Sequence, residues 1–410
     1  MGIERRPEVF ILNDYSTPNG GSSVVALLSA MELARRGCRV TLFTAKGDGV
    51  HQERGIRNLC LEQETIRDDP NRVRAIGNGL YNFVASRRLR SALAKQDPHA
   101  TVIHVHSYTI ALSASVIATA LDMGFPVVLS LHDFFITCPT GGFFLHKQSK
   151  ICELTPQSWS CIACNCDRRN FLHKQWRVAR TVLQNQGLRI DRRISHFIGV
   201  SDFSVDVIKP FLPAEAKITT IPNPVQAENI GPAPVGTNSA FVFIGRFSRE
   251  KGPQIFAKAT SRLAINAVFI GDGDLSEELR RECPDATFTG WLSQDEVRTW
   301  LRCARALVFP PLWYETLGLV VVEAASAGVP AIVSSRCAAI DFVRHDETGL
   351  IFDHGSVDSL CDQIKRLSDD SATAAKLGAS AHRWYWQNPW SVERHVDELL
   401  KLYDQMLPSH

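Results

Sequence analysis

The chain has 410 residues, of which 45% are hydrophobic, and a formal charge of only +2 at pH 7. This length predicts two domains of about 200 residues each, and the near-neutral charge argues against nucleic acid as a partner. No apolar run approaches the roughly 20 residues that a membrane-spanning helix needs. Because the segment before the first apolar run also lacks the core of a signal peptide, we expect a cytoplasmic protein.

The first half of the chain alternates strand and helix signals. Short apolar runs typical of buried strands occupy residues 9–12, 39–43, 102–106, 127–131 and 194–200. A helix is expected over residues 21–36, and a polar, cysteine-rich insertion interrupts the pattern at about 138–170. This alternation predicts an α/β domain in which helices cover both faces of a parallel sheet.

A second alternating series follows a stretch rich in Pro, Gly and Ala that ends at Gly236 and is typical of a linker. Its strands are expected at residues 240–245, 266–270, 286–289, 305–309 and 330–334. The chain therefore divides into an N-terminal domain at 1–225, a C-terminal domain at 226–388 and a final helix within 389–410 that should return toward the first domain. Two doubly wound, Rossmann-like domains would leave a cleft between the carboxyl ends of their strands.

Glu315 and Glu323 frame the most informative segment. The apolar run 306–309 predicts a buried strand, and a helix is expected from about Leu317, so that its unpaired N–H groups can bind an anion. At the helical rise, eight residues span roughly 12 Å, about the length of a hexose, a diphosphate and a ribose together. One carboxylate could hold sugar hydroxyls while the other holds ribose hydroxyls.

Two basic residues follow the first strand of the second series. Arg246 can fork onto phosphate oxygens, and Lys251 can add a flexible point charge. Alone, such residues are often solvated surface charges. Beside the helix start that follows Glu315, they favour a diphosphate site.

The first domain contributes two further candidates. Gly20 and Gly21 open its first helix and would let a phosphate or sugar approach the backbone, although tight turns also require glycine and the full G-x-G-x-x-G fingerprint is absent. His132 follows a predicted strand and could contact a sugar hydroxyl, or could simply be satisfied within its loop.

The insertion contains a C-x8-C-x2-C-x-C run. Cys138, Cys152, Cys161 and Cys164 could supply the four thiolates of a structural zinc site and leave Cys166 spare. Free thiols or a disulfide are the alternatives. The Asp272 and Asp274 pair fits a turn between glycines, and no metal is expected there.

Together these segments resemble the retaining glycosyltransferases of the GT-B type, which have two Rossmann-like domains, and in particular family 4, with its many bacterial polysaccharide and lipopolysaccharide assembly enzymes. The matching segments in chain order are Gly20-Gly21, the His132 loop, Pro222-Asn223-Pro224, Gly245-Arg246 with Glu250-Lys251-Gly252, Gly271-Asp272-Gly273, the Glu315 to Glu323 element, and Ala327-Gly328-Val329-Pro330.

The resemblance implies roles for these residues. Arg246 and Lys251 would bind the donor diphosphate, Glu323 the ribose, and Glu315 the sugar, which His132 would also approach. The backbone that receives the sugar and distal phosphate would be Thr316, Leu317, Gly318 and Leu319. The segment from Arg336 to Asp341 departs from the family's usual glycine-rich stretch, and Trp313 and Thr316 are less common choices.

The expected activity is transfer of a hexose-type sugar, with retention, from a nucleoside diphosphate sugar bound by the C-terminal domain to a glycan or lipid-linked acceptor bound by the N-terminal domain. Catalysis would need no cofactor. The setting would be synthesis of a cell-surface polysaccharide or glycoconjugate. The alternatives are a nucleotide-sugar epimerase of the same fold and a non-catalytic sugar-nucleotide-binding protein.

A basic segment follows the cysteines. Its charged residues are Asp167, Arg168, Arg169, Lys174, Arg177, Arg180, Arg189, Asp191, Arg192 and Arg193. A solvated helix face is one interpretation. The other is reversible docking on an anionic membrane, where each basic residue contributes on the order of 1 kcal/mol. The apolar residues Phe171, Leu172, Trp176, Val178 and Leu183 would then insert, or would belong to the core.

Overall fold

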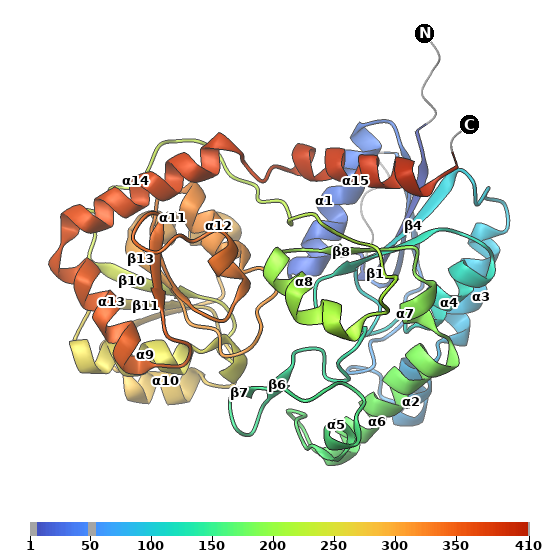
Figure 1. Cartoon of the computed structure of the whole chain (residues 1–410), viewed down its shortest axis with the longest axis horizontal. Coiled ribbons are helices and arrows are strands. Elements are labelled where there is room, and N and C mark those ends of the chain that lie inside the picture. The colour runs from blue at the N-terminus through green and yellow to red at the C-terminus, as the bar shows by residue number, and fades with distance from the viewer. Residues whose placement is uncertain (1–5, 48–54, 409–410) are drawn as a thin grey trace, which may run out of the picture.

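The computed structural model describes residues 6–47 and 55–408, which form two lobes (Figure 1). The first lobe is built on a seven-stranded parallel sheet of order β3-β2-β1-β4-β5-β8-β9. These strands are β1 Glu8–Tyr15, β2 Arg39–Lys46, β3 Ile56–Cys60, β4 Thr101–Val105, β5 Val127–Leu131, β8 His196–Gly199 and β9 Ile218–Thr220.

Helices cover both faces of this sheet. The helices of this lobe are α1 Gly21–Arg35, α2 Arg72–Leu80, α3 Phe83–Leu93, α4 Ser115–Asp122, α5 Trp159–Ala163 in the insertion, α6 Phe171–Val182, α7 Ile190–Arg193 and α8 Asp202–Ile208. Successive side chains of a strand point to opposite faces. Accordingly, Val9 and Ile11 pack with α1, whereas Phe10 and Leu12 belong to the core that contains α3 and α4.

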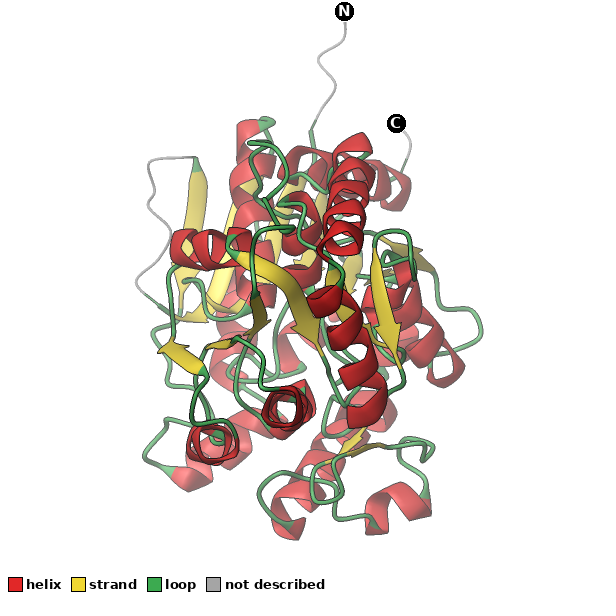
Figure 2. Ribbon diagram, turned by 90° about the vertical axis from the view of Figure 1, so that its left-hand side faces the viewer, coloured by secondary structure: helices red, strands yellow, loops and turns green. Residues whose placement is uncertain are grey.

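The second lobe has a six-stranded parallel sheet of order β12-β11-β10-β13-β14-β15. Its elements are β10 Ala240–Ile244, α9 Pro253–Leu263, β11 Ala267–Ile270, α10 Ser276–Glu282, β12 Thr287–Gly290, α11 Gln294–Arg302, β13 Ala304–Phe309, α12 Leu319–Ser326, β14 Ala331–Ser334, β15 Gly349–Phe352, α13 Val357–Asp369 and α14 Ser371–Gln387. Figure 2 shows the strands as a layer between helices. The prediction of two doubly wound α/β domains is confirmed.

The chain then crosses back to the first lobe. Helix α15, Val392–Met406, lies along α1 and buries Val396, Leu399 and Tyr403 in the same core as Val9 (Figure 1). Within the described residues, no helix combines the length and apolarity needed to cross a bilayer.

A short antiparallel hairpin interrupts the first domain. Its strands are β6 Phe144–Leu145 and β7 Lys150–Ile151, and they lie within the cysteine-rich insertion. In Figure 1 this hairpin extends from the first lobe toward the second. The insertion is therefore positioned to contact both domains.

Candidate functional site

The segment after β13 connects a buried strand to a helix start. Gly318 adopts φ 82° at the N-cap of α12, and a Cβ there would lie 2.8 Å from the Phe309 ring, so glycine is required twice over. The helix begins at Leu319, two residues later than expected. Because the chain from Glu315 to Gly318 is not helical, the helical rise does not give the separation of Glu315 and Glu323, and the estimate of roughly 12 Å loses its basis.

Glu315 is buried and has two partners in its own domain. Lys251 Nζ lies 2.6 Å from its Oε2, and Trp313 Nε1 donates to the same oxygen at 2.9 Å. The ammonium also lies 5.1 Å from the centre of the Trp313 ring. The structure therefore brings Lys251 and Glu315 together as a neutral pair beside the start of α12, where a diphosphate would have access to the lysine.

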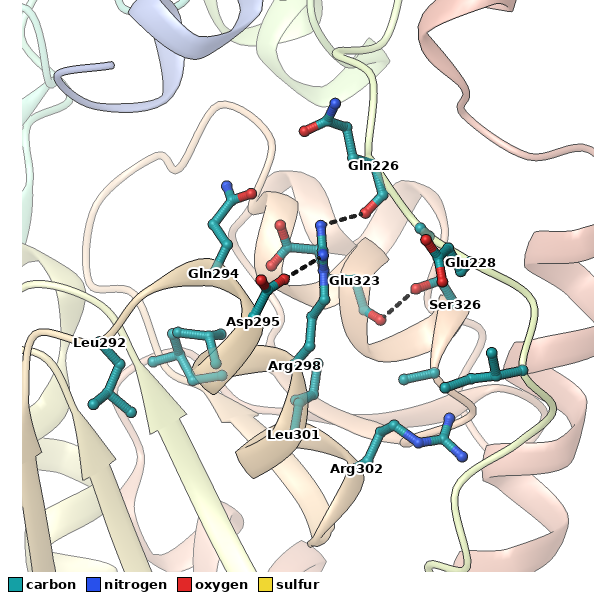
Figure 3. Close-up of a pocket in the computed structure, with 15 residues that line it drawn as sticks. Gln226, Glu228, Leu292, Gln294, Asp295, Arg298, Leu301, Arg302, Glu323 and Ser326 are labelled. Carbon is teal, nitrogen blue, oxygen red and sulfur yellow. Dashed lines mark hydrogen bonds and ion pairs between the residues drawn. The ribbon is translucent and has the colours of Figure 1, made fainter. Parts of the chain in front are cut away.

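Glu323 lines a cavity of about 470 Å³ between α11, α12 and the interdomain linker (Figure 3). Ile244, Leu292 and Leu301 provide apolar walls. Burial raises the pKa of the Glu323 carboxyl, and the nearby Arg298 opposes this shift. A cavity with apolar walls and carboxylates at its edge, from Glu228, Asp295 and Glu323, suits a nucleoside, because the base is flat and the ribose carries a diol.

Linker residues that no motif identified also shape this cavity. Arg298 donates to the Gln226 carbonyl at 3.0 Å and to Asp295 at 2.8 Å, as Figure 3 shows. Glu228 lies on the linker at the same cavity. Composition alone marked this stretch as a linker, and nothing in its sequence distinguishes the residues that face a ligand.

Arg246 lies away from the Glu323 cavity. It lines a second cavity, of about 530 Å³, together with Ser22 from the first domain. Ser22 follows Gly20, which caps α1 with φ 87°, and Gly21, whose Cβ position lies 4.0 Å from Leu319 Cδ1. The Gly20-Gly21 loop of the first domain therefore faces the start of α12 in the second. Two predicted donor contacts, Gly21 and Leu319, thus come from different domains.

His132 stands where the two domains touch. Its carbonyl accepts a hydrogen bond from the Thr316 hydroxyl at 3.2 Å, and its Nε2 lies 3.0 Å from His106 Nδ1. Burial lowers the pKa of His132 to about 3. The imidazole is therefore neutral near pH 7, and its Nε2 is engaged by His106.

The cysteine-rich insertion reaches the second domain at several points. Phe144 is buried in the core of that domain with Phe247 and Leu312. Gly142 approaches so closely that a Cβ there would lie 2.9 Å from the Trp313 ring. Two ion pairs flank this contact: Arg168 with Asp274, and Arg336 with Glu153 at 3.3 Å. The insertion thus packs against Trp313, whose Nε1 donates a hydrogen bond to Glu315.

The predicted zinc ligands are not brought into a metal site. Across residues 6–47 and 55–408, no group of three or more His, Cys, Asp or Glu has the geometry to hold a metal ion. Lys174 is fully buried near Cys161, to which its ammonium donates at 3.5 Å. A buried ammonium beside Cys161 does not suit a zinc ion at that thiol.

The basic segment does not form one solvated surface. Lys174 and Arg180 are buried, Arg177 Nε lies 3.0 Å from Asp167, and Arg193 pairs with a carboxylate of α4 at 2.6 Å. The interpretation as a continuous exposed basic face is therefore wrong for these positions, although Arg168 and Arg169 are exposed.

We expect acid to destabilise the protein through its buried histidines. Burial holds the pKa of His395 at about 4, whereas an unfolded histidine takes up a proton near pH 6.5. The folded state therefore loses up to about 1.4 kcal/mol per pH unit as the pH falls from about 6.5 to about 4. Urea unfolding measured from about pH 7.5 to about pH 5 should show a shallower fall in His395→Gln than in the wild type. The exposed His99→Gln is the control, and parallel curves for all three proteins would contradict the expectation.

Replacing Phe144 with alanine tests the contact of the insertion with the second domain. A buried Phe→Ala change costs about 3 to 5 kcal/mol, and Phe144 is 1% exposed within the core of the other domain. We expect a loss of this size in the unfolding free energy, with faster proteolysis of the insertion. Phe171→Ala, at an exposed position nearby, should be nearly neutral. Equal stability of the two variants would show that the insertion is not anchored by Phe144.

Comparison of the sequence with curated proteins finds relatives among mannosyltransferases. Two curated relatives match parts of the chain: the O-antigen chain mannosyltransferase C of Escherichia coli, 26% identical over 43% of this chain and 48% of that protein, and a GDP-mannose-dependent alpha-(1-6)-phosphatidylinositol monomannoside mannosyltransferase of Mycobacterium tuberculosis, 29% identical over 37% and 43%. The chain thus spans about half the length of the curated relatives it matches.

Solved structures share the whole fold. Sucrose-phosphate synthase from Thermosynechococcus elongatus aligns with a TM-score of 0.74 at 18% identity, over 98% of this chain and 99% of that one. Anabaena HepE in complex with UDP-glucose aligns with a TM-score of 0.67 at 16% identity, over 97% and 100%. These likenesses show the GT-B fold.

The family models divide the chain at the linker. The model described as glycosyl transferases group 1 matches residues 238–370, and the model described as Glycosyltransferase Family 4 matches residues 19–229. The second match covers more than half of the chain, and the resemblance seen in the sequence is confirmed. The chain belongs to glycosyltransferase family 4.

Proposed function

We propose that this chain transfers a sugar from a nucleoside diphosphate sugar to a glycan or lipid-linked acceptor. The observation that carries the proposal is the Lys251–Glu315 pair at the start of α12, 2.6 Å apart. Glu315 lies in the loop between β13 and α12, the first residue of α12 faces Gly21 of the other domain, and a cavity of about 470 Å³ adjoins Glu323. The named relatives include mannosyltransferases, and the HepE structure contains UDP-glucose.

The donor would extend across the C-terminal domain. Its base would occupy the cavity with apolar walls and its ribose would meet Glu323. Its diphosphate would lie against the free N–H groups of α12 and Lys251, which leaves the sugar near Glu315 and His132. Each group would then act on the part of the donor that suits its charge.

Catalysis would rest on charge already in place. As the bond between the sugar C1 and the phosphate oxygen breaks, negative charge grows on the leaving diphosphate, where Lys251, Arg246 and the helix start would stabilise it. These cations supply the charge that a metal ion would otherwise provide, so metal independence is part of the proposal. Retention belongs to it on family resemblance: the acceptor oxygen bonds to C1 on the face that the diphosphate leaves, and the departing phosphate takes the hydroxyl proton. The substrate is proposed to be a hexose destined for a cell-surface polysaccharide or glycoconjugate.

Alanine in place of Arg246 or Lys251 should each reduce kcat/KM by about a hundredfold, which corresponds to about 3 kcal/mol of transition-state stabilisation. The donor is first identified by thermal shift with UDP-, GDP- and ADP-sugars, because a ligand that binds only the folded state raises its stability. Lys258→Ala, an exposed change on α9, is the control. Near-normal turnover of both variants would reject the roles of these cations. Conversion of the donor to its epimer without acceptor would reject transfer itself.

We also propose peripheral association with the inner face of an anionic membrane, through the exposed residues of the basic segment together with the adjacent helix α2. Val73 on α2 and Leu172 on α6 are 82% and 81% exposed. These two helices are adjacent, since Trp176 Nε1 donates to the Ile76 carbonyl at 3.3 Å. Exposed Arg169 precedes α6. Apolar side chains that insert beside an arginine suit an anionic lipid surface.

Liposome flotation tests this association. We expect more protein to float with anionic than with neutral vesicles, and a large loss of binding in Leu172→Glu and Arg169→Glu. Trp291→Glu, at an exposed apolar position of the other domain, is the matched control. Equal recovery with both kinds of vesicle, or an equal loss in the control, would contradict the proposal. Lys174 and Arg177 are unsuitable for this test because they are buried or ion-paired.

A further inference from the structure

The second cavity carries an unusual excess of positive charge. Its volume is about 530 Å³, and it opens between the two domains. The arginines that line it are Arg67, Arg168, Arg169, Arg177, Arg180 and Arg246. Only two acidic residues, Asp133 and Asp167, lie among the lining residues. A concave site with this charge balance attracts anions.

Arg180 is the most informative of these residues. It is 8% exposed, and its guanidinium lies 5.0 Å from the centre of the Phe135 ring and 5.4 Å from that of Trp176. Its Nη1 donates to the Thr109 carbonyl at 3.1 Å. These contacts fix the direction of the guanidinium without neutralising it.

No carboxylate of the described residues lies within ion-pair distance of Arg180. Burial lowers the pKa of its guanidinium to about 10, so the group remains charged near pH 7. A buried charge that has no ion-pair partner costs folding free energy, which is why removing one member of a buried ion pair strongly destabilises a protein. An anion that entered the cavity would remove part of this cost.

Of the two aspartates, one is ion-paired and the other influences Arg180 from beyond ion-pair distance. Asp167 lies 3.0 Å from Arg177, and the Asp133 carboxyl accepts a hydrogen bond from the Phe135 backbone at 3.0 Å. Arg168 pairs with Asp274 of the second domain. Arg67, Arg169 and Arg180 are therefore the first-domain guanidinium groups of this cavity that have no ion pair with a carboxylate among the described residues, whereas Arg246 faces the donor side.

We propose that this cavity binds the phosphoryl group of an anionic acceptor, a phosphate or diphosphate next to the sugar that receives the transfer. The proposal rests on the proposed function, because Arg246 and Ser22 place one end of the cavity at the donor side. Guanidinium forks match phosphate oxygens, and several of them suit a multiply charged group. Such an acceptor is either a lipid-linked diphosphate or a soluble sugar phosphate.

The test measures binding of inorganic pyrophosphate by calorimetry, in full-length protein saturated with whichever of UDP and GDP stabilises it. The nucleotide fills the donor diphosphate site, so the signal reports a second site. We expect roughly tenfold weaker binding in Arg67→Ala and in Arg180→Gln, the loss expected for one charge-assisted hydrogen bond. Nucleotide affinity should be unchanged in both variants. Because Arg67 is exposed, its variant remains informative even where Arg180→Gln fails to fold.

Arg88→Ala removes one exposed arginine of the same domain outside the cavity and is the control. Wild-type affinity in the Arg67 variant, or an equal loss in Arg88→Ala, would overturn the proposal, the second by showing diffuse electrostatic attraction only. Failure of every nucleotide to bind would instead count against the proposed function. Competition by farnesyl diphosphate or by glucose 1-phosphate then separates the lipid-linked source from the soluble one, and displacement by neither would also overturn the assignment.

Discussion

Parallel strands deliver the loops that follow them to one edge of their sheet, and every functional feature of this chain depends on that constraint. The loop after β5 carries His132, and the loop after β13 carries Thr316. The Thr316 hydroxyl donates to the His132 carbonyl, and the Ser201 hydroxyl after β8 donates to the Thr316 carbonyl at 2.6 Å. Two hydrogen bonds therefore join the loops that follow three strands, β5 and β8 of the first domain and β13 of the second.

Charge is distributed unevenly around this meeting point. Lys251 and Glu315 neutralise each other, whereas Arg246 and Arg180 line a common cavity and have no ion pair with a carboxylate in the part of the chain that the structure describes. Arg180 is held by two aromatic rings and a carbonyl oxygen. A ligand that carries both hydroxyls and phosphates would find separate partners for each, since carboxylates accept from hydroxyls and guanidinium groups donate to phosphates.

The sequence was most predictive where local pattern decides the structure. Buried apolar runs located β1, β10 and β13, and the strand, glycine and helix pattern located the start of α12 within two residues. The edge strands β3 and β9 were missed because they lack the continuous apolar run of a central strand, whereas β15, Gly349–Phe352, was missed although it is apolar and mostly buried. Tertiary contacts, which no short window contains, decide which strands lie at an edge.

The burial of charged side chains was harder to predict than the burial of apolar side chains. Lys174, Arg177 and Arg180 are spaced three apart and share one face of α6, and this spacing was the available signal. A basic stripe is usually solvated, so the expectation failed where the fold turns that face inward. Asp167, the Phe135 ring and Cys161, which receive these cations, come from other segments. Sequence spacing shows which residues share a face, but not what covers it.

The insertion connects the two sides of the site mechanically. Its Arg168 lines the second cavity, of about 530 Å³, and pairs with Asp274 of the second domain. Its Gly142 packs against Trp313, which donates to Glu315. Close-packed contacts transmit displacement instead of absorbing it. A movement of the insertion would therefore alter the cavity in one domain and the support of Glu315 in the other. The cysteine-rich insertion therefore links the cavity where an anion would bind to Glu315, the carboxylate beside the start of α12.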